Sequence, residues 1–347
     1  MDGNVNFPID LVYSWVDGND PVWRAKKEKH MREAGLLHQD AKTCARFRDN
    51  DELKYSLRSA QKFAPWINHI YIVTDGQTPK WLNTKHPKIS VVDHKQIMPA
   101  DALPTFNSYA IENYIDNIPG LSEYFLYSND DTMFGRDHIP DDFFSADGVP
   151  INIVKLRREE KIWTEGDLGK AVAAKTGLHG KNIMFVRKLV YDKTGKKYYC
   201  WPSHNIEPLR KSYFSETKGV FCKELHATTR NKFRKSPELS WFVHILYNNA
   251  LGRSKLVLHK NYGDIPDVYE AGDCRGLNRK SVARFLKRIF CRPRYMTLDG
   301  RLIAGAILKH KPSLFCINDT DTNDAHVLRS NREFFESYFP NKSEFEL

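Results

Sequence analysis

The sequence predicts an α/β protein built on a mostly parallel β-sheet. In the first 150 residues, short apolar segments typical of strands alternate with segments of helical periodicity, and this alternation produces parallel strands. Acidic and amide side chains follow three of the predicted strands directly. With 347 residues, of which 41% are hydrophobic, the chain is long enough to bury a substantial core.

Four strands are predicted in the first half from runs rich in β-branched and aromatic residues. They cover Ile9–Trp15, Ile70–Thr74, Ile89–Val92 and Tyr124–Tyr127. Parallel strands bring their carboxyl ends to one edge of the sheet, which is where such sheets bind ligands. Asp17, Asp75 and the sequence Asn129-Asp130-Asp131 follow these strands, so we expect them at that edge.

Helices are predicted between the strands. A polar helix covers residues 22–34, and a second helix is capped by Asp49 or Asn50 and ends at Pro65. Its apolar face consists of Leu53, Leu57, Ala60 and Ala64, which recur with helical spacing. Asn107 or Ser108 begins another helix, whose inward side chains are Ile111, Tyr114, Ile115 and Ile118.

The second half shows weaker patterns. Met184–Trp201 is typical of a hairpin with its turn near Gly195, and Leu239–Leu251 is typical of an amphipathic helix. A strand over Leu314–Ile317 and a helix that includes residues 333–338 follow. No linker rich in proline or serine separates the halves. We therefore expect a single domain over residues 1–347, in which a second half (151–347) is woven onto a first half (1–150).

Positive charge is concentrated in one segment. The net charge is +10, and residues 253–311 hold fourteen Lys or Arg against five Asp or Glu. Such a block binds nucleic acid, an anionic membrane or a phosphate-rich ligand, or it is a solvated basic face. Residues 281–290 have the pattern of a helix lying on a membrane, and equally of a helix packed on the core. No arrangement of aromatic stacking platforms favours nucleic acid.

The location of the protein is predicted from features that the sequence lacks. No apolar run reaches the roughly 18 residues of a membrane-spanning helix, and the N-terminus has no signal-peptide pattern. The six cysteines form no CxxC pair and are expected to be reduced. We expect a cytoplasmic protein, with peripheral contact at the inner face of the cell membrane as one role for the basic segment.

The Asn129-Asp130-Asp131 sequence is the sharpest local sign of chemistry. Adjacent carboxylates in one turn repel each other unless a cation is present. Mg²⁺ or Mn²⁺ would supply that cation and leave coordination sites for diphosphate oxygens. The alternative is an ordinary turn capped by an Asx side chain. The position of the pair after a strand, with Asp17 at the end of another, favours the metal.

Cationic and basic side chains suggest a phosphate site. Arg46, Arg48 and Arg58 surround the start of a helix, where their guanidinium groups either bind phosphate or pair with neighbouring acids. His204 lies between two prolines and is either a general acid or base or a structural residue. Residues 226–234, which include Arg230 and Arg234, form a further candidate anion site.

Four segments of the chain together resemble the Stealth family of bacterial capsular-polysaccharide phosphotransferases. This family includes the eukaryotic N-acetylglucosamine-1-phosphotransferase of the lysosomal targeting pathway. The first segment is IDLVYSWVDGNDP. The second is RFRDNDELKYSLRSAQKFAPWINHIYIVTDGQTPKWLN, and it continues through LPTFNSYAIE to YFLYSNDDTMFG. The third and fourth are HNIEPLRKSYF and FCINDT.

The resemblance implies a glycosyltransferase-A-like core and transfer of a hexose-1-phosphate or N-acetylhexosamine-1-phosphate. It also implies that residues 1–150 bind a UDP-sugar donor and the metal, and that residues 151–347 form the acceptor half. The implied acceptor is a sugar hydroxyl of a lipid-linked or polymeric glycan. The acceptor hydroxyl attacks the phosphorus next to the sugar, so that a phosphodiester forms and UMP leaves. Ordinary metal-dependent glycosyl transfer, which releases a nucleoside diphosphate, is the alternative.

The resemblance also implies roles for individual residues. Asp131, Asp130 and Glu112 would hold Mg²⁺ or Mn²⁺. His204 and Arg234 would lie at the reacting phosphate, and the general base is either His204 or a carboxylate such as Asp17 or Asp49. The expected substrate-binding residues are Asp10, Trp15, Asn50 and Arg58 in the matching segments, with Arg46, Asn107 and Arg230 beside them.

Overall fold

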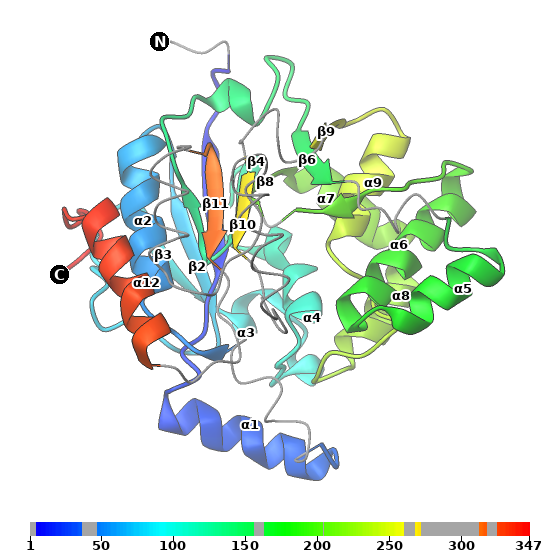
Figure 1. The fold of residues 1–347 in the computed structure, drawn as a ribbon, viewed down its shortest axis with the longest axis horizontal. Coiled ribbons are helices and arrows are strands. Elements are labelled where there is room, and N and C mark those ends of the chain that lie inside the picture. The colour runs from blue at the N-terminus through cyan, green and yellow to red at the C-terminus, as the bar shows by residue number, and fades with distance from the viewer. Residues whose placement is uncertain are drawn as a thin grey trace, which may run out of the picture.

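The structure of the chain is a computed structural model, and its centre is a five-stranded sheet (Figure 1). The residues that it describes are 5–36, 47–155, 163–203, 205–259, 268–271, 312–317 and 325–347. The strands of the sheet are β1 (Ile9–Ser14), β2 (Ile70–Thr74), β3 (Ile89–Asp93), β4 (Tyr124–Asn129) and β8 (Glu207–Arg210). Their order is β3-β2-β1-β4-β8, with only β8 antiparallel to its neighbour. The predicted mixed, mostly parallel sheet is confirmed.

The register of the sheet brings the strand ends together. Ser14, the last residue of β1, lies opposite Val73 of β2 and Asn129 of β4. The loops after β1, β2 and β4 therefore leave the sheet at one edge, which we call the carboxyl edge. Because β8 belongs to the second half of the chain, that half supplies one strand of the central sheet.

Two small sheets adjoin the central one. The first has the order β10-β11-β5, and the second has the order β7-β6-β9. Their strands are β5 (Thr132–Phe134), β6 (Ile151–Lys155), β7 (Trp201–Pro202), β9 (Lys255–His259), β10 (Val268–Ala271) and β11 (Leu314–Ile317). β11 confirms the strand predicted over the same residues.

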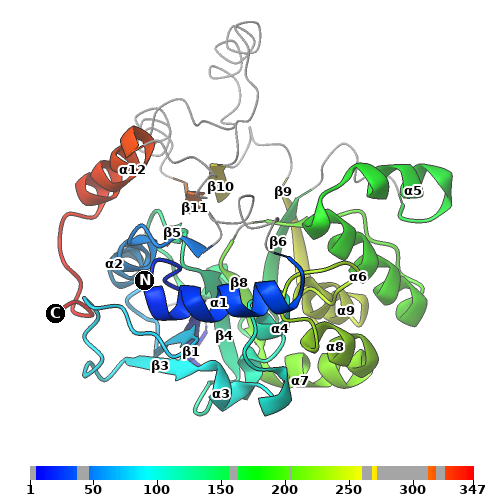
Figure 2. The same cartoon turned by 90° about the horizontal axis from the view of Figure 1, so that it is seen from below.

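Helices cover both faces of the central sheet. Successive strand residues point to opposite faces, so Leu11 and Tyr13 pack with α2 while Val12 packs on the other side. That other face lies under α6, α7 and α9, through side chains such as Ile183 and Phe242. The helix α1 lies across the carboxyl edge, as the view from below shows (Figure 2).

The helices have the following bounds. They are α1 (Pro21–Glu33), α2 (Glu52–Phe63), α3 (His94–Ile97), α4 (Ser108–Glu112), α5 (Gly166–Lys175), α6 (Leu178–Thr194), α7 (Lys211–Val220), α8 (Cys222–Thr229), α9 (Phe242–Ala250) and α12 (Ala325–Tyr338). The helix predicted from residue 107 or 108 ends at Glu112, and a 3-10 turn over Ile115–Asn117 follows it. Within the described residues, no helix combines the length and the apolar character needed to cross a membrane.

The start of α2 differs from the prediction. Its apolar face is confirmed, since Leu53, Leu57 and Ala60 are buried. The residue before the helix is Asp51, in the left-handed conformation with φ of 69°, and neither Asp49 nor Asn50 is the cap. The Glu52 side chain turns back and accepts hydrogen bonds from the backbone N–H of Asn50 (2.6 Å) and from its amide (2.8 Å). This interaction replaces a conventional side-chain cap.

The predicted hairpin over residues 184–201 is wrong. Residues up to Thr194 continue the helix α6, and only the short β7 follows. The buried side chains Ile183, Val186 and Val190 recur at helical spacing, which outweighs the β-branched character of the segment. Gly195 is the left-handed C-cap of the helix, with φ of 71°, and its N–H donates to Tyr191 O (2.7 Å). The glycine therefore ends a helix and does not turn a hairpin.

Arg58 of α2 binds the C-terminal residues of the chain through hydrogen bonds and an ion pair. Its guanidinium donates to both carboxylate oxygens of Glu346 (2.7 and 2.6 Å) and to Phe339 O (2.7 Å). The two charged side chains are 11% and 4% exposed. Near them, Phe345 is buried in the core cluster that contains α2.

Replacing Arg58 with alanine should therefore lower the free energy of unfolding by about 3 kcal/mol, because it leaves Glu346 buried without its partner. Urea denaturation measures this change. Replacing Glu346 with alanine should cost a similar amount, and the double variant should cost little more than either single one. Fully additive losses would contradict the pairing.

Candidate active site

Gln77 ties together two loops at the carboxyl edge. The backbone N–H of Asp17, after β1, donates to Gln77 Oε1 (3.0 Å), and the Gln77 amide donates to Asp17 O (2.9 Å). The Asp17 carboxylate accepts a hydrogen bond from the backbone N–H of Asn19 (2.8 Å). The loop after β1 is thus fixed against the loop after β2, and the Asp17 charge acts on Asp49.

The residues before α2 and in its first turn form an acidic corner. Burial, with smaller contributions from the Asp51 and Asp17 carboxylates, raises the pKa of Asp49 to about 6. Burial likewise raises the pKa of Glu52 to about 7, although hydrogen bonds from Asn50 oppose this rise. Both carboxyl groups consequently titrate near neutral pH, which suits proton transfer.

The turn between β4 and β5 lies against this corner. Burial and the nearby carboxylates of Asp131, Glu52 and Asp49 raise the pKa of Asp130 well above its ordinary value. The structure thus brings Asp130 and Asp131 together with Asp49 and Glu52. Carboxylates that crowd in this way are stabilised by a bound cation.

The donor set fits a metal that arrives with its substrate. Within the described ranges, no three Asp, Glu, His or Cys side chains are arranged to hold a metal ion. Mg²⁺ commonly binds one or two carboxylates and takes its other ligands from phosphates and water. The Asp130–Asp131 turn offers two carboxylates of this kind. It therefore fits Mg²⁺ or Mn²⁺ bound together with a diphosphate, and not a closed protein cage.

Glu112 does not join Asp130 and Asp131 in a three-carboxylate metal site. It ends α4, is 5% exposed, and has Arg234, Ser108 and Tyr127 as its neighbours. Burial raises the pKa of Glu112, and the positive charge of Arg234 limits this rise. The Oε2 atom of Glu112 is buried and has no hydrogen-bond partner. The predicted trio is therefore split into a carboxylate turn and a separate group of Glu112 with Arg234.

Tyr127 links these two groups. The hydroxyl of this β4 residue lies 3.1 Å from Ser14 Oγ at the end of β1. Burial raises the pKa of Tyr127 well above its ordinary value, with further contributions from the charges of Glu112 and Asp130, while Arg234 acts in the opposite direction. A single phenol thus lies within the electrostatic reach of both groups.

Arg234 is held over α4 by several contacts. Its guanidinium carbon lies 4.8 Å from the centre of the Tyr109 ring, and its Nη2 donates to Ser108 Oγ. The neighbouring Phe233 stacks on Phe106, with ring centres 5.2 Å apart, and Trp23 of α1 meets Phe106 edge-on at 5.5 Å. The loop that carries Arg234 and the helix α1 consequently pack on the same Phe106 ring.

Three predicted substrate-binding residues have structural contacts in the described structure. Asp10 lies near the start of β1, away from the carboxyl edge, and its carboxylate accepts hydrogen bonds from the Asn68 amide (2.8 Å) and the Ser122 N–H (2.7 Å). Arg58 pairs with Glu346, as described above. Asn107 caps α4 and donates to Glu238 Oε1 (2.8 Å) and Asn231 O (3.2 Å). These two bonds tie the start of α4 to the loop that carries Arg234.

The other predicted substrate-binding residues differ in position. Trp15 is 6% exposed, and its indole N–H has no partner at hydrogen-bond distance, although it lies close enough to Asp49 to lower that pKa. Asn50 donates to Glu52 within the acidic corner. Arg230 is exposed at the end of α8.

Some predicted residues cannot be placed. His204 and Arg46 lie outside the described residues, as does most of the basic segment 253–311. Their roles stay predictions.

Two residues of the site were missed by sequence reasoning. Tyr127 was assigned to an apolar strand, although its place two residues before Asn129 puts a polar hydroxyl beside the acidic turn. In the sequence, Glu52 is only one of the neighbouring acids with which the arginines could pair at the surface, whereas in the structure it is buried. Its spacing from the strand-end acids carried no signal, because only folding brings α2 to β4.

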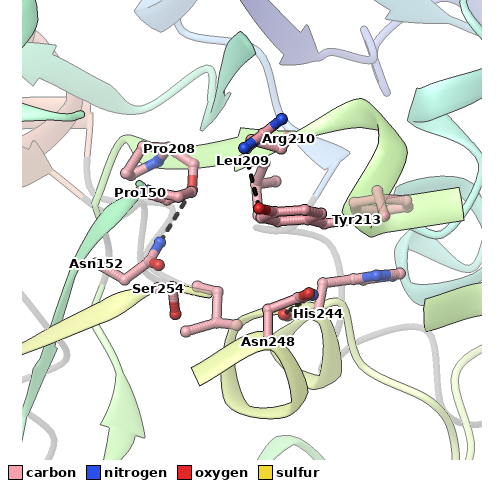
Figure 3. A pocket seen from close by; sticks show the side chains of 11 residues that line it. Pro150, Asn152, Pro208, Leu209, Arg210, Tyr213, His244, Asn248 and Ser254 are labelled. Carbon is pink, nitrogen blue, oxygen red and sulfur yellow. Dashed lines mark hydrogen bonds between the residues drawn. The ribbon is translucent and has the colours of Figure 1, made fainter. Parts of the chain in front are cut away.

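A pocket lies away from this site. Asn152 of β6, Arg210 of β8, Tyr213 of α7 and His244 of α9 are among its lining residues (Figure 3). Arg210 pairs with Tyr124, at the start of β4, so the pocket lies toward the opposite end of that strand from the acidic turn. None of the predicted site residues lines it.

Comparisons with known proteins agree with the sequence segments. Family models described as Stealth protein conserved regions 1, 2 and 4 match residues 7–33, 46–152 and 305–347. The segment HNIEPLRKSYF stays a prediction as the third region. The capsular polysaccharide phosphotransferase fcs1 of Haemophilus influenzae is 31% identical, over 97% of this chain and 85% of that protein.

An exopolysaccharide phosphotransferase of Streptomyces coelicolor is 35% identical over 99% of this chain and 53% of its own length. The chain thus spans about half of this relative. Two solved structures are similar in fold. One is the galactosyltransferase LgtC in complex with donor and acceptor sugar analogues (TM-score 0.43, 10% identity, 96% of each chain). Another is the glycosyltransferase GlyE of Streptococcus pneumoniae (TM-score 0.45, 11% identity, 97% of this chain and 61% of that one).

Proposed function

The chain belongs to the Stealth protein family, and we propose that it transfers a sugar-1-phosphate from a UDP-sugar to a hydroxyl of a capsular or cell-surface glycan. The observation that carries this proposal is the arrangement at the carboxyl edge. The charges of Asp130, in an acidic turn suited to a metal with a diphosphate, and of the Arg234 guanidinium both act on Tyr127, so both groups lie near this residue. Phosphoryl transfer depends mainly on positioning and on charge neutralisation, which these groups would provide.

In the proposed reaction, the acceptor oxygen forms a bond to the phosphorus that carries the sugar. The anhydride bond between the two phosphates breaks, and UMP leaves with that bond's electron pair. The acceptor hydroxyl gives its proton to a base of the protein. The bond between the sugar C1 and its oxygen is never broken, so the anomeric configuration is retained.

The residues would divide this work as follows. Asp130 and Asp131 would hold Mg²⁺ or Mn²⁺, which neutralises charge on the diphosphate. Arg234 would bind phosphate oxygens through its planar fork of donors. The base is either His204 or a carboxylate. Among the carboxylates, Asp49 is supported by its raised pKa of about 6, which leaves most of the group ionised yet basic at neutral pH.

The proposal for the acceptor is based on the positive charge of one segment of the sequence. The proposed acceptor is a lipid-linked or polymeric glycan, and the basic segment 253–311 would bind either its anionic groups or the anionic membrane beneath it.

Product analysis tests the proposed function. Incubation with a panel of UDP-hexoses, a glycan acceptor and Mg²⁺ should release UMP and form a phosphodiester. An ordinary glycosyltransferase would instead release UDP and form a glycoside. Release of UDP in place of UMP, with no phosphodiester in the product, would rule out the proposed reaction.

A further inference from the structure

The carboxyl edge also holds, at the ends of β2 and β3, a second group of polar side chains that the proposed mechanism does not use. Asp75 directly follows β2, and Asp93 ends β3. His94 begins α3, and the charges of both carboxylates and of Lys26 in α1 act on its pKa. The backbone at Gly76 brings the two loops close, since a Cβ there would lie 3.3 Å from Asp93 Oδ2.

His94 has an unmet hydrogen-bonding capacity in this group. Its side chain is 5% exposed, and its Nδ1 has no hydrogen-bond partner. A buried ring nitrogen without a partner is costly unless a ligand or water completes it. Burial lowers the pKa of His94, so the ring is neutral at physiological pH and Nδ1 is able to pair with a neutral polar group.

The chemistry of Asp75 limits what such a ligand would be. Its carboxylate lies 2.5 Å from the Lys26 ammonium and is 11% exposed. An ionised carboxylate only accepts hydrogen bonds and repels phosphate. The matching ligand group therefore carries N–H or O–H donors and no negative charge.

The place of the group along the edge fits one end of a nucleotide. β1 lies between β2 and β4, so the ends of β2 and β4 are two strand spacings apart, about 10 Å. A diphosphate held at the Asp130–Asp131 turn would extend its nucleoside along the edge in one of two directions. Toward β2 it meets Asp75 and His94, whereas toward β8 the edge is completed by an antiparallel strand.

We propose that Asp75 and His94 form the nucleoside-recognition subsite of the donor, in which the Asp75 carboxylate accepts a hydrogen bond from the base or the ribose and His94 Nδ1 pairs with a neighbouring polar atom. This inference rests on the proposed function, because it takes the donor to be a nucleoside diphosphate sugar. In the absence of donor, Lys26 balances the charge of Asp75 and keeps α1 against the edge.

Two sources of the donor group are distinguishable. The ribose offers hydroxyls, and the uracil ring offers its imide N–H. Calorimetric binding of UDP, 2′-deoxy-UDP, 3′-deoxy-UDP and N3-methyl-UDP to the full chain in Mg²⁺ should show weaker binding for at least one analogue, by about 10- to 100-fold. The weakened analogue identifies the group that Asp75 recognises.

The variant Asp75→Ala should bind UDP about 10- to 100-fold more weakly, and it should no longer distinguish UDP from that analogue. Lys26→Met is the matched control, since it breaks the same ion pair but keeps the carboxylate, and it should retain the discrimination. If Asp75→Ala, folded by its thermal midpoint, discriminates as strongly as the wild type, the subsite is overturned. Absence of UDP binding and of UMP release in the wild type would instead contradict the proposed function itself.

Discussion

Replacing Asp131 with asparagine should lower turnover by about 10³-fold or more while the protein stays folded. The change removes one of two carboxylates that face the proposed metal and diphosphate, and the charge of the transferring group is then poorly neutralised. UMP release in Mg²⁺ measures the loss, and thermal unfolding checks the fold. Asp137→Asn makes the same charge change at an exposed position and should leave turnover unchanged.

Chelation should have the same effect as this substitution. EDTA should abolish UMP release, and added Mg²⁺ or Mn²⁺ should restore it. Full turnover in the chelator would contradict the metal role of the Asp130–Asp131 turn. An Asp131→Asn protein that is unfolded would favour the alternative of an ordinary structural turn.

At the neighbouring Asp130, the same type of substitution should increase the stability of the metal-free protein. Its charge is opposed by Asp131, Glu52 and Asp49, so Asp130→Asn should raise the midpoint of thermal unfolding of the metal-free protein while it lowers activity. The pH dependence follows from the same repulsion. Asp49 and Glu52 have folded-state pKa values of about 6 and about 7, above those of the unfolded chain. Their contribution to stability is therefore present in acid and is lost as the pH rises from about 4 to about 7.

Divalent cation should reduce this loss, because it favours the ionised carboxylates. Thermal midpoints recorded across this pH range, with and without Mg²⁺, measure the effect. Curves that coincide with and without the cation would show that no cation binds at the Asp130–Asp131 turn beside the acidic corner.

Replacing Arg234 with alanine should lower turnover by about 10³-fold, the second large effect. The guanidinium is positioned by Tyr109 and Ser108 and faces Glu112, so its loss removes a fixed cation from the proposed phosphate site. Arg234→Lys should recover little of this activity, since an ammonium keeps the charge but not the planar fork. Assays of UMP release over a range of donor concentrations measure the change.

Added guanidinium should partly restore the alanine variant and should have no effect on the lysine variant. Lys235→Ala removes an exposed cation next along the chain and serves as the control with unchanged turnover. If Arg234→Ala changes the thermal midpoint but not the turnover, Arg234 only packs α4 against the loop after α8.

Local pattern was sufficient for most of the central sheet. β1, β2, β3 and β4 are short apolar runs ended by turn residues, and their order with the intervening helices leads to parallel pairing without any knowledge of long-range contacts. Local pattern was not sufficient for the segment of α6, where the predicted hairpin is wrong. The β-branched residues and the glycine near its end are compatible both with a hairpin and with a helix. Only burial of Ile183, Val186 and Val190 on one side selects the helix.

By itself, the sequence determined the family, the fold class and the gathering of acidic residues at strand ends, since these depend on residue type and order along the chain. The tertiary structure decided which of those residues meet. In the structure, Glu112 lies near Arg234 and Arg58 pairs with Glu346, while Asp10 lies near the start of β1. These partners lie on elements that are distant in the sequence, and their contacts follow from packing and register. No local spacing specifies them.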